Sequence, residues 1–216
     1  MNKLDLDKIE TCLSRPICEA AIPKTVNDPI GVLNRWKYLS QQFPRFLGAI
    51  LSRNSLPAAQ CLVAKNITGE CGSGQFDAMH SKLFAELVEP VVCSTRSSFC
   101  STSLEAVIES NLVKLAAMSE GESIGFLIGL EAPAYEILDL LRRCLADVGM
   151  ESSIVDSSIY MVTHQEVEAE HQQDSLLMAQ VAAEIGCEEA EILRGGQHAV
   201  EFWNDWWAAQ IQAQAS

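Results

Sequence analysis

Residues 157–185 read SSIYMVTHQEVEAEHQQDSLLMAQVAAEI, and the next residue is Gly186. The stretch contains neither Pro nor Gly, so it predicts one long helix that ends at Gly186. Apolar residues recur at helical spacing along most of the remaining chain, whereas alternating runs rich in Val, Ile and Thr are scarce. The sequence therefore predicts an all-α fold, a helical bundle of about seven helices joined mainly by short connections.

Proline and glycine mark the ends of the other expected helices. We expect helices at about 5–14, 30–53, 57–71, 76–89, 104–119 and 123–148, and a last helix after Arg194-Gly195-Gly196. Pro44 and Pro133 fall inside two of these ranges and should bend those helices, whereas Pro90 should stop the helix at 76–89. We expect a single helical domain over residues 1–216, with 1–25 as an N-terminal extension and short helix and 26–216 as the bundle core.

The composition fits a globular protein and excludes several classes of function. Of the 216 residues, 48% are hydrophobic, which is enough for a sizeable core, and the formal net charge is −14. Such an acidic surface repels phosphate backbones, so we expect no nucleic-acid partner. The N-terminus is charged where a signal peptide needs an apolar core, and the longest run without polar side chains, residues 124–130, is too short to span a membrane. We therefore expect a cytoplasmic protein with no membrane partner.

Cysteine usage agrees with a reducing compartment. The eight cysteines are Cys12, Cys18, Cys61, Cys71, Cys93, Cys100, Cys144 and Cys187. None of them forms a CxxC pair, and no secretory signal accompanies them. They are most simply reduced thiols that fill a helical core.

The long helix at 157–185 carries the strongest sign of chemistry. His164, Glu168 and His171 are spaced i, i+4 and i+7, so their side chains lie along one narrow stripe of that helix. Two imidazoles and a carboxylate on one face suit Fe(II), Mn(II) or Zn(II), and Glu168-x-x-His171 has the spacing used in di-iron carboxylate bundles. The surrounding Glu and Gln residues are equally typical of a solvated polar helix, and the spacing alone leaves both interpretations open.

Glu131 is a second candidate ligand because it ends the apolar run Phe126-Leu-Ile-Gly-Leu-Glu131. Burial of an ionised carboxylate is costly unless the group is paired or bound to a metal. The alternative is a helix that surfaces at Pro133 and leaves Glu131 in solvent. Glu136, about one and a half turns later, is the competing carboxylate.

Glu70 and His80 form a third pair, on either side of the segment Gly72-Ser73-Gly74. A turn between two helices can aim both side chains into one cavity. Three of the four histidines belong to these three groups, whereas His198 fits a surface or packing position. The full candidate set holds three carboxylates and three imidazoles, a count that suits two cations sharing a bridging carboxylate: Glu70, His80, Glu131, His164, Glu168 and His171.

The ordered set resembles the haem-oxygenase-like di-iron oxidases. The likeness rests on Glu70-x9-His80, on Glu131 in Gly-Leu-Glu131-Ala-Pro, and on the spaced triad of the long helix, and it covers about residues 25–210. The resemblance implies a haem-oxygenase-like bundle that binds two Fe(II) ions between its helices and activates O2. It also implies a small organic substrate, amino-acid-like or fatty-acid-like, and leaves a homodimer open.

One ligand position departs from the family pattern. The family usually has Asp at the centre of the last triad, where this chain has Glu168. Glutamate is longer by one methylene, so we expect a weaker second iron site. Oxygen and imidazole ligands also serve Mn(II), so manganese is an alternative to iron.

Tyr160 lies one helical turn before His164, which makes it a candidate catalytic residue, as a hydrogen donor or substrate contact, or else an ordinary core residue. The cluster of Trp203, Trp206 and Trp207 fits packing.

Other classes of function remain open at this stage. The same fold carries metal-free enzymes, thiaminase-like ones with a nucleophilic Cys and cofactorless oxidases, and an acidic bundle can also be a non-catalytic interaction module. Metal content distinguishes these classes. A haem oxygenase proper takes its axial His from the first helix, and no His precedes His80 in this chain. A ferritin-like bundle places Glu-x-x-His on two helices, and here only Glu168-x-x-His171 has that spacing.

Overall fold

The computed structural model describes residues 22–23, 25–92, 102–184 and 186–212, apart from a few side chains inside the helices. All regular elements in these residues are helical, which confirms the expected all-α fold. The α-helices are α2 (Pro29–Ser40), α3 (Phe43–Arg53), α4 (Pro57–Glu70), α5 (His80–Val92), α6 (Thr102–Ala117), α7 (Glu120–Glu131), α8 (Ala134–Asp147), α9 (Ser152–Asp156), α10 (Ile159–Glu184) and α11 (Glu189–Gln212). Two 3₁₀ turns, η1 (Gly72–Gly74) and η2 (Phe76–Ala78), lie between α4 and α5. The helix expected at 5–14 lies outside the described residues.

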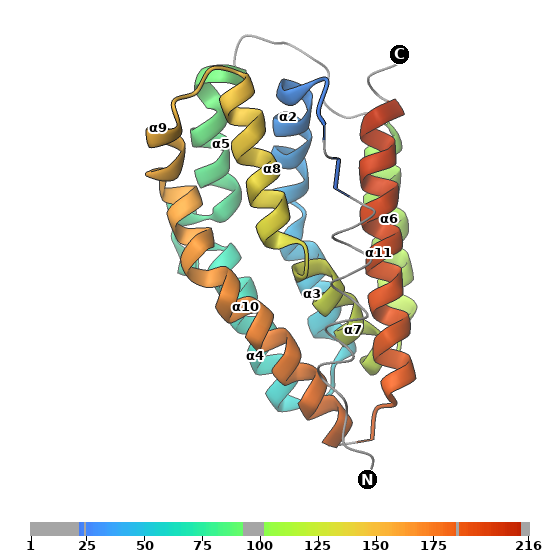
Figure 1. The fold of residues 1–216 in the computed structure, drawn as a ribbon. Helices are drawn as coiled ribbons and strands as arrows, with labels where there is room; N and C mark the ends of the chain where they lie inside the picture. Colours follow the sequence, from blue (N-terminus) through green and yellow to red (C-terminus); the bar gives the residue numbers. More distant parts are fainter. Residues whose placement is uncertain (1–21, 24, 93–101, 185, 213–216) are drawn as a thin grey trace.

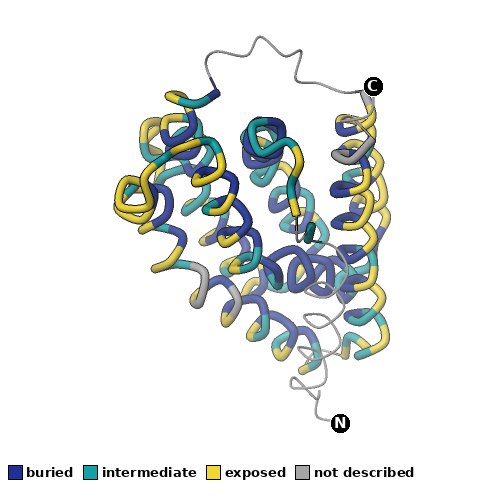
Figure 2. The backbone as a smooth tube through the Cα atoms, turned by 45° about the horizontal axis from the view of Figure 1, so that its top comes forward, coloured by how far each residue is buried: buried dark blue, intermediate teal, exposed yellow. Residues whose placement is uncertain are grey.

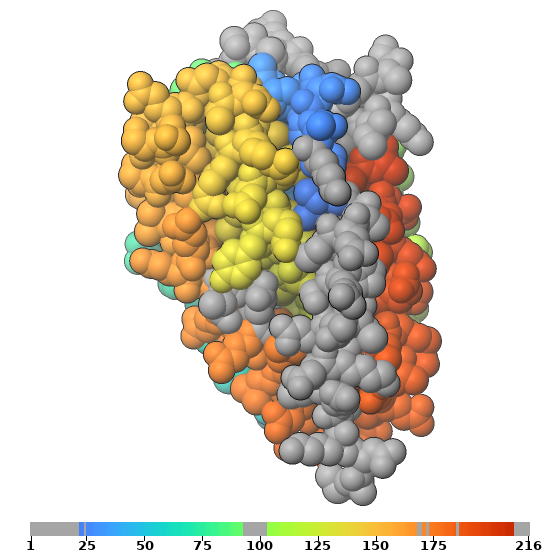
Figure 3. Space-filling model, in the orientation of Figure 1, coloured from blue at the N-terminus to red at the C-terminus, as the bar shows by residue number. Residues whose placement is uncertain are grey.

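The helices run roughly side by side, and α10 and α11 approach each other at one end of the molecule and diverge toward the other (Figure 1). The tube view shows that most helices turn their buried residues toward the interior and their exposed residues outward, whereas α7 is buried along nearly its whole length (Figure 2). In the space-filling view, α8 and α10 occupy one side of the visible face, α2 lies beside α8, and α11 forms the opposite flank (Figure 3).

Two long helices of the sequence-based prediction are divided into separate helices. The range 30–53 is divided into α2 and α3, and Pro44 lies in the first turn of α3 instead of bending a continuous helix. The range 123–148 is likewise divided into α7 and α8 at Ala132 and Pro133. Proline lacks the N–H that an interior helical position needs but fits the first turn, where that N–H has no partner. Pro44 accordingly lies in the first turn of α3, and Pro133 is the N-cap residue immediately before α8.

The expected helix at 76–89 is shifted toward the C-terminus. Residues 76–78 form η2, and α5 begins at His80 and continues past Pro90 to Val92. Val88 and Val92 are both buried on one face of the helix, and their burial favours its last turn despite the missing hydrogen bond at Pro90. The short helix α9 was not predicted.

The last helix does not begin after Gly195-Gly196 but runs through this pair from Glu189 to Gln212. The reason is a close crossing of α7 and α11, which we call the glycine crossing. A Cβ on Gly195 would lie 1.8 Å from the carbonyl oxygen of Glu122, and a Cβ on Gly125 would lie 1.8 Å from the carbonyl oxygen of Ile192. These glycines let two backbones touch, so their lack of a side chain serves packing and does not end a helix.

Candidate metal centre

A tight turn brings Glu70 and His80 together. Glu70 is the last residue of α4 and His80 the first of α5, and the turn between them has positive φ angles at Gly72, Ser73 and Gly74. Gly72 is also in close contact, because a Cβ there would lie 2.4 Å from the carbonyl carbon of Ala78. Glycine at this position therefore permits both the left-handed backbone and the close approach. The result is a contact of 3.1 Å between His80 Nδ1 and Glu70 Oε1.

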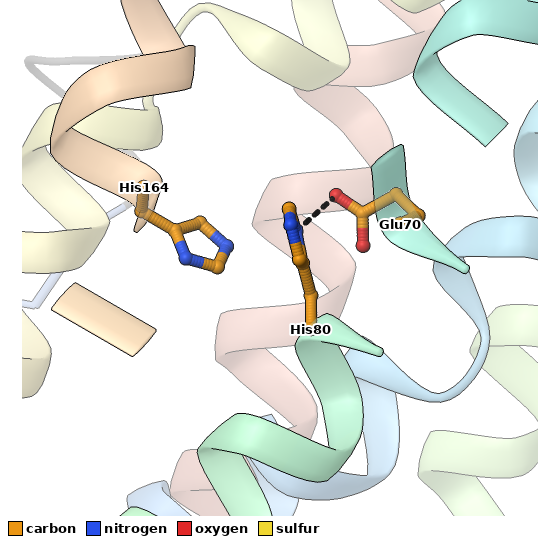
Figure 4. Close-up of side chains that lie close together, drawn as sticks. All are labelled: Glu70, His80 and His164. Carbon is orange, nitrogen blue, oxygen red and sulfur yellow. Dashed lines mark hydrogen bonds and ion pairs between the residues drawn. The ribbon is translucent and has the colours of Figure 1, made fainter. Parts of the chain in front are cut away.

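His164 approaches this pair from α10, on the other side of the interior (Figure 4). One possible ligand atom from each of Glu70, His80 and His164 lies within 4.8 Å of the other two. The rings of His80 and His164 have their centroids 4.6 Å apart. His164 thus converges with a pair of residues that lies far from it in the sequence.

The orientation of His164 is fixed by its own helix. Its Nδ1 lies 2.8 Å from the carbonyl oxygen of Tyr160. A carbonyl only accepts hydrogen bonds, so Nδ1 carries the hydrogen and Nε2 keeps its lone pair for a ligand. The Tyr160 ring lies against the imidazole with centroids 4.0 Å apart, and the Tyr160 hydroxyl accepts a hydrogen bond of 3.1 Å from Trp36 Nε1.

Burial favours the neutral, coordinating form of His164 and His171. Desolvation, reinforced by the charge of His80, lowers the pKa of His164 to about 4. Desolvation also lowers the pKa of His171. Burial alone would raise the pKa of Glu70, but the hydrogen bond with His80 and the nearby histidine charges hold that pKa below its ordinary value. Neutral imidazoles beside an ionised carboxylate are the protonation states that metal binding requires.

Glu131 and His171 form a second group close to the first. Glu131 ends α7, His171 lies on α10, and their side chains approach to 4.0 Å between Glu131 Oε2 and His171 Nδ1. Both residues are buried, and Glu131 lines the same pocket as Glu70, His80 and His164. Glu136, the competing carboxylate, is not among the residues that line this pocket. Glu168 belongs to α10, but its side chain lies outside the described residues.

The donor set fits a cation. Among the described residues, those that line the pocket include two carboxylates and two imidazoles but neither Lys nor Arg. Buried carboxylates need a positive partner, and oxygen and imidazole donors together suit Fe(II) or Mn(II). The structure therefore brings Glu70, His80 and His164 together as one candidate metal-binding group and places Glu131 and His171 close to each other near it.

An open pocket adjoins these side chains. It is open to solvent, and its empty volume of about 510 Å³ includes part of that solvent. The lining residues are Trp36, Ser40, Phe43, Glu70, His80, Leu130, Glu131, Ala134, Ile137, Leu138, Tyr160, His164 and Trp203. The sequence-based interpretation missed Trp36, Phe43 and Ser40 as site residues and treated Trp203 as packing only. Apolar residues have the same helical spacing in the sequence whether they face a packed core or a cavity. The sequence therefore did not indicate that these residues line a pocket.

The remaining candidates lie away from the pocket. His198 is on α11 and pairs with Glu201 at 3.1 Å near the surface, in agreement with its expected place. None of the four described cysteines, Cys61, Cys71, Cys144 and Cys187, lines the pocket. Burial raises the pKa of the Cys144 thiol to about 11, which disfavours a nucleophilic thiolate. Within the part of the chain that the structure describes, no helix has the length and apolar character needed to cross a membrane.

Comparison with solved structures agrees with this architecture. A CADD-like protein of unknown function from Nostoc punctiforme, solved at 2.00 Å resolution, matches with a TM-score of 0.76 and 14% sequence identity over 97% of this chain and 96% of that chain. A second structure of that protein, at 1.35 Å resolution, matches with a TM-score of 0.71 and 14% identity over 97% and 94% of the two chains. At this identity the likeness shows the fold alone. No curated protein sequence matches the chain.

The sequence itself matches a protein family over most of its length. The model of the family described as "iron-containing redox enzyme" matches residues 31–204, a range that includes all six candidate ligands. This chain therefore belongs to that family of iron-containing redox enzymes.

Proposed function

We propose that this protein is an oxidoreductase that binds two iron ions between α4, α5, α7 and α10 and uses them to activate O2 on a small organic substrate. The observation that carries the proposal is the convergence of the half-buried Glu70 with the buried His80 and His164 beside an open pocket. Family membership supports iron as the metal. When bound, iron would supply the redox chemistry with O2 that amino-acid side chains lack.

The chain's own residues would hold and orient the metal. Glu70, His80 and His164 would bind one ion, and Glu131 and His171, with Glu168 as the predicted further ligand, would bind the second. Tyr160 fixes the imidazole of His164 through its backbone carbonyl, and Trp36 restrains Tyr160 in turn. The apolar walls of the pocket would limit the access of water to the reacting centre.

A metal-free enzyme and an interaction module explain these features less well. A thiaminase-like nucleophile would need a cysteine in the pocket, and none of the described cysteines lines it. A module that only binds another protein has no need for buried histidines and carboxylates, which cost stability unless they are paired.

Iron binding tests the proposal directly. Metal-free protein would be loaded with Fe(II) without air, desalted and analysed for iron per chain, and the uptake of O2 would then be followed with an oxygen electrode. We expect close to two ions per chain with a weaker second site, and O2 uptake that exceeds that of the same amount of free Fe(II).

Two matched pairs of variants locate the metal. His164→Ala and Glu131→Ala should lower the bound iron, whereas His198→Ala and Glu136→Ala, which change residues outside the pocket, should not. Equal iron in all four variants, or iron no higher than in a control protein, would exclude the proposed centre.

A further inference from the structure

Asn66 is a buried polar residue of α4 whose side-chain oxygen is unused within the described chain. The residue is 2% exposed, and its Oδ1 has no hydrogen-bond partner among the described residues. A buried carbonyl oxygen without a donor costs free energy, and a bound ion or water is a common reason that such an oxygen is kept. The surroundings of Asn66 therefore show what its oxygen could bind.

The position of Asn66 on α4 directs its side chain toward the candidate metal centre. The buried residues of this helix are Ala59, Val63 and Asn66, which are spaced i, i+4 and i+7 and thus lie on one face. Glu70 follows Asn66 by four residues, which is one helical turn, and therefore continues the same face. The amide of Asn66 lies one turn before a candidate ligand and on its side of the helix.

Helices α4 and α10 pack against each other and run in opposite directions (Figure 1). Lys65 of α4 forms an ion pair of 2.7 Å with Glu170 of α10. Glu70 lies later in α4, and it meets His164, which lies earlier in α10. The ion pair thus fixes which part of α10 lies opposite the turn that contains Asn66.

Asn66 and His171 lie behind this ion pair at nearly the same level. Lys65 and Glu170 are exposed, and the residue that follows each of them, Asn66 or His171, is buried. One residue advances a helix by only about 1.5 Å, so the two buried side chains remain level with the pair. The His171 imidazole contacts Glu131 at 4.0 Å, which is longer than a hydrogen bond, and it forms no hydrogen bond with the other described residues.

Two other buried asparagines have an unpartnered amide atom, but their chemistry differs. Asn54 is held by two hydrogen bonds from its Nδ2, to the Ile50 carbonyl at 2.8 Å and to the Ser123 hydroxyl at 3.1 Å. The unpartnered atom of Asn34 is Nδ2, a hydrogen-bond donor that cannot bind a cation. Neither of these explanations applies to the Oδ1 of Asn66.

We propose that Asn66 is a further ligand of the second metal position, where its Oδ1 binds the cation together with Glu131 and His171. An amide oxygen has lone pairs that bind cations, but it adds no charge. One bound cation would then partner both the oxygen of Asn66 and the imidazole of His171. The inference rests on the proposed function for the presence of a second ion.

Asn66→Leu tests the inference because leucine has nearly the shape of asparagine but no oxygen. Metal-free protein would be titrated with Fe(II) without air, and equilibrium dialysis would give the Kd of each site. We expect the Kd of the weaker site to rise at least about ten-fold and that of the tighter site to change less than about two-fold. The metal-free variant should have a Tm at or above that of the parent, because an unpartnered buried oxygen is removed.

Two further variants distinguish a ligand from a residue that serves the fold. Asn66→Asp keeps an oxygen donor and adds a negative charge, so the Kd of the weaker site should equal that of the parent or fall below it. Asn111→Leu is the matched control, because Asn111 of α6 is also buried but its Nδ2 donates to the Val107 carbonyl at 2.8 Å. This control should lower the Tm of the metal-free protein and leave both Kd values unchanged.

The inference fails if Asn66→Leu binds both ions as the parent does, if it weakens the two sites equally, or if Asn66→Asp loses the weaker site as well. It also fails if Asn66→Leu lowers the Tm of the metal-free protein as Asn111→Leu does, because the oxygen would then serve the fold. Fewer than two bound ions in the parent would instead overturn the proposed function, so the two failures are distinguishable.

Discussion

The glycine crossing and the candidate metal centre lie in the same bundle but have opposite chemistry. In the crossing of α7 and α11, backbone meets backbone because Gly125 and Gly195 lack a side chain. In the centre, Glu70, His80 and His164 place polar side chains in the interior, where each is costly without a partner. The first region therefore serves stability, whereas the second is the proposed metal site. A change in the crossing should therefore damage the fold, and a change in the centre should damage metal binding while the fold persists.

The largest expected effect is on stability at the glycine crossing. Gly125→Ala places a methyl group where a Cβ would lie 1.8 Å from the Ile192 carbonyl oxygen, so α7 and α11 must separate. We expect the free energy of unfolding to fall on the order of 3 kcal/mol or more, or the protein to fail to fold. Urea unfolding of the metal-free protein, followed by circular dichroism, measures this.

Gly48→Ala is the matched control, because Gly48 lies in α3 and a Cβ there has no atom within 4 Å. It should stabilise the protein by about 0.5–1 kcal/mol through the lower flexibility of the unfolded chain. Equal stabilities for the two alanine variants would show that the crossing is not as close as the structure indicates.

At the metal centre, a nearly isosteric change should separate binding from folding. Glu131→Gln keeps the size of the side chain but removes the charge that a cation requires. We expect iron affinity to fall at least about ten-fold, while the metal-free protein keeps its thermal stability within a few degrees. Glu136→Gln, on the next helix and outside the pocket, should change neither quantity. If Glu131→Gln lost much of its stability but bound iron as the parent does, Glu131 would serve the fold and not metal binding.

The buried histidines should make the metal-free centre sensitive to acid. The pKa of His164 is lowered to about 4 from an ordinary value of 6.5, so between these values the unfolded chain holds more protons. Stability contributed by neutral His164 is thus fully present above pH 6.5 and is lost as the pH falls toward 4, by up to about 3 kcal/mol. The low pKa of Glu70 acts in the same direction at lower pH.

Urea unfolding at several pH values measures this loss, and His164→Gln provides the comparison. The variant should lose less stability than the parent between pH 6.5 and 4, because the glutamine side chain does not titrate. Parallel stability curves for parent and variant would show that His164 does not contribute to the acid sensitivity.

A further test concerns the contact between Trp36 and Tyr160, which supports the centre. Tyr160→Phe leaves Trp36 Nε1 buried without its acceptor and should cost about 1–3 kcal/mol in stability. Iron binding should change little, because the backbone carbonyl that orients His164 is retained. Thermal unfolding and iron content measure the two quantities, and a double variant with Trp36→Phe should recover part of the lost stability. No recovery would show that the hydrogen bond is not the source of the cost.

The helical class and the main candidate residues were predictable from the sequence because they depend on local rules. Helical spacing places His164 and His171 on one stripe, and the apolar run before Glu131 indicates burial. The turn after Glu70 could also be predicted from its two glycines, Gly72 and Gly74, which both have positive φ angles.

The remaining features depend on contacts between distant segments. Gly195-Gly196 was expected to precede a helix, but the pair lies inside α11 because α7 approaches it. In the same way, Trp36 and Phe43 line the pocket only because α2 and α3 pack beside α8 and α11. The spacing of apolar residues along one helix does not show which neighbouring helix those residues face.

We propose that two iron ions bind between α4, α5, α7 and α10. The most direct measurement is an anomalous difference map at the iron absorption edge, from crystals of the protein loaded with Fe(II) without air. Two peaks should appear, one beside Glu70, His80 and His164 and a weaker one beside Glu131 and His171. A map without peaks in this pocket, or with iron bound only at the surface, would contradict the account.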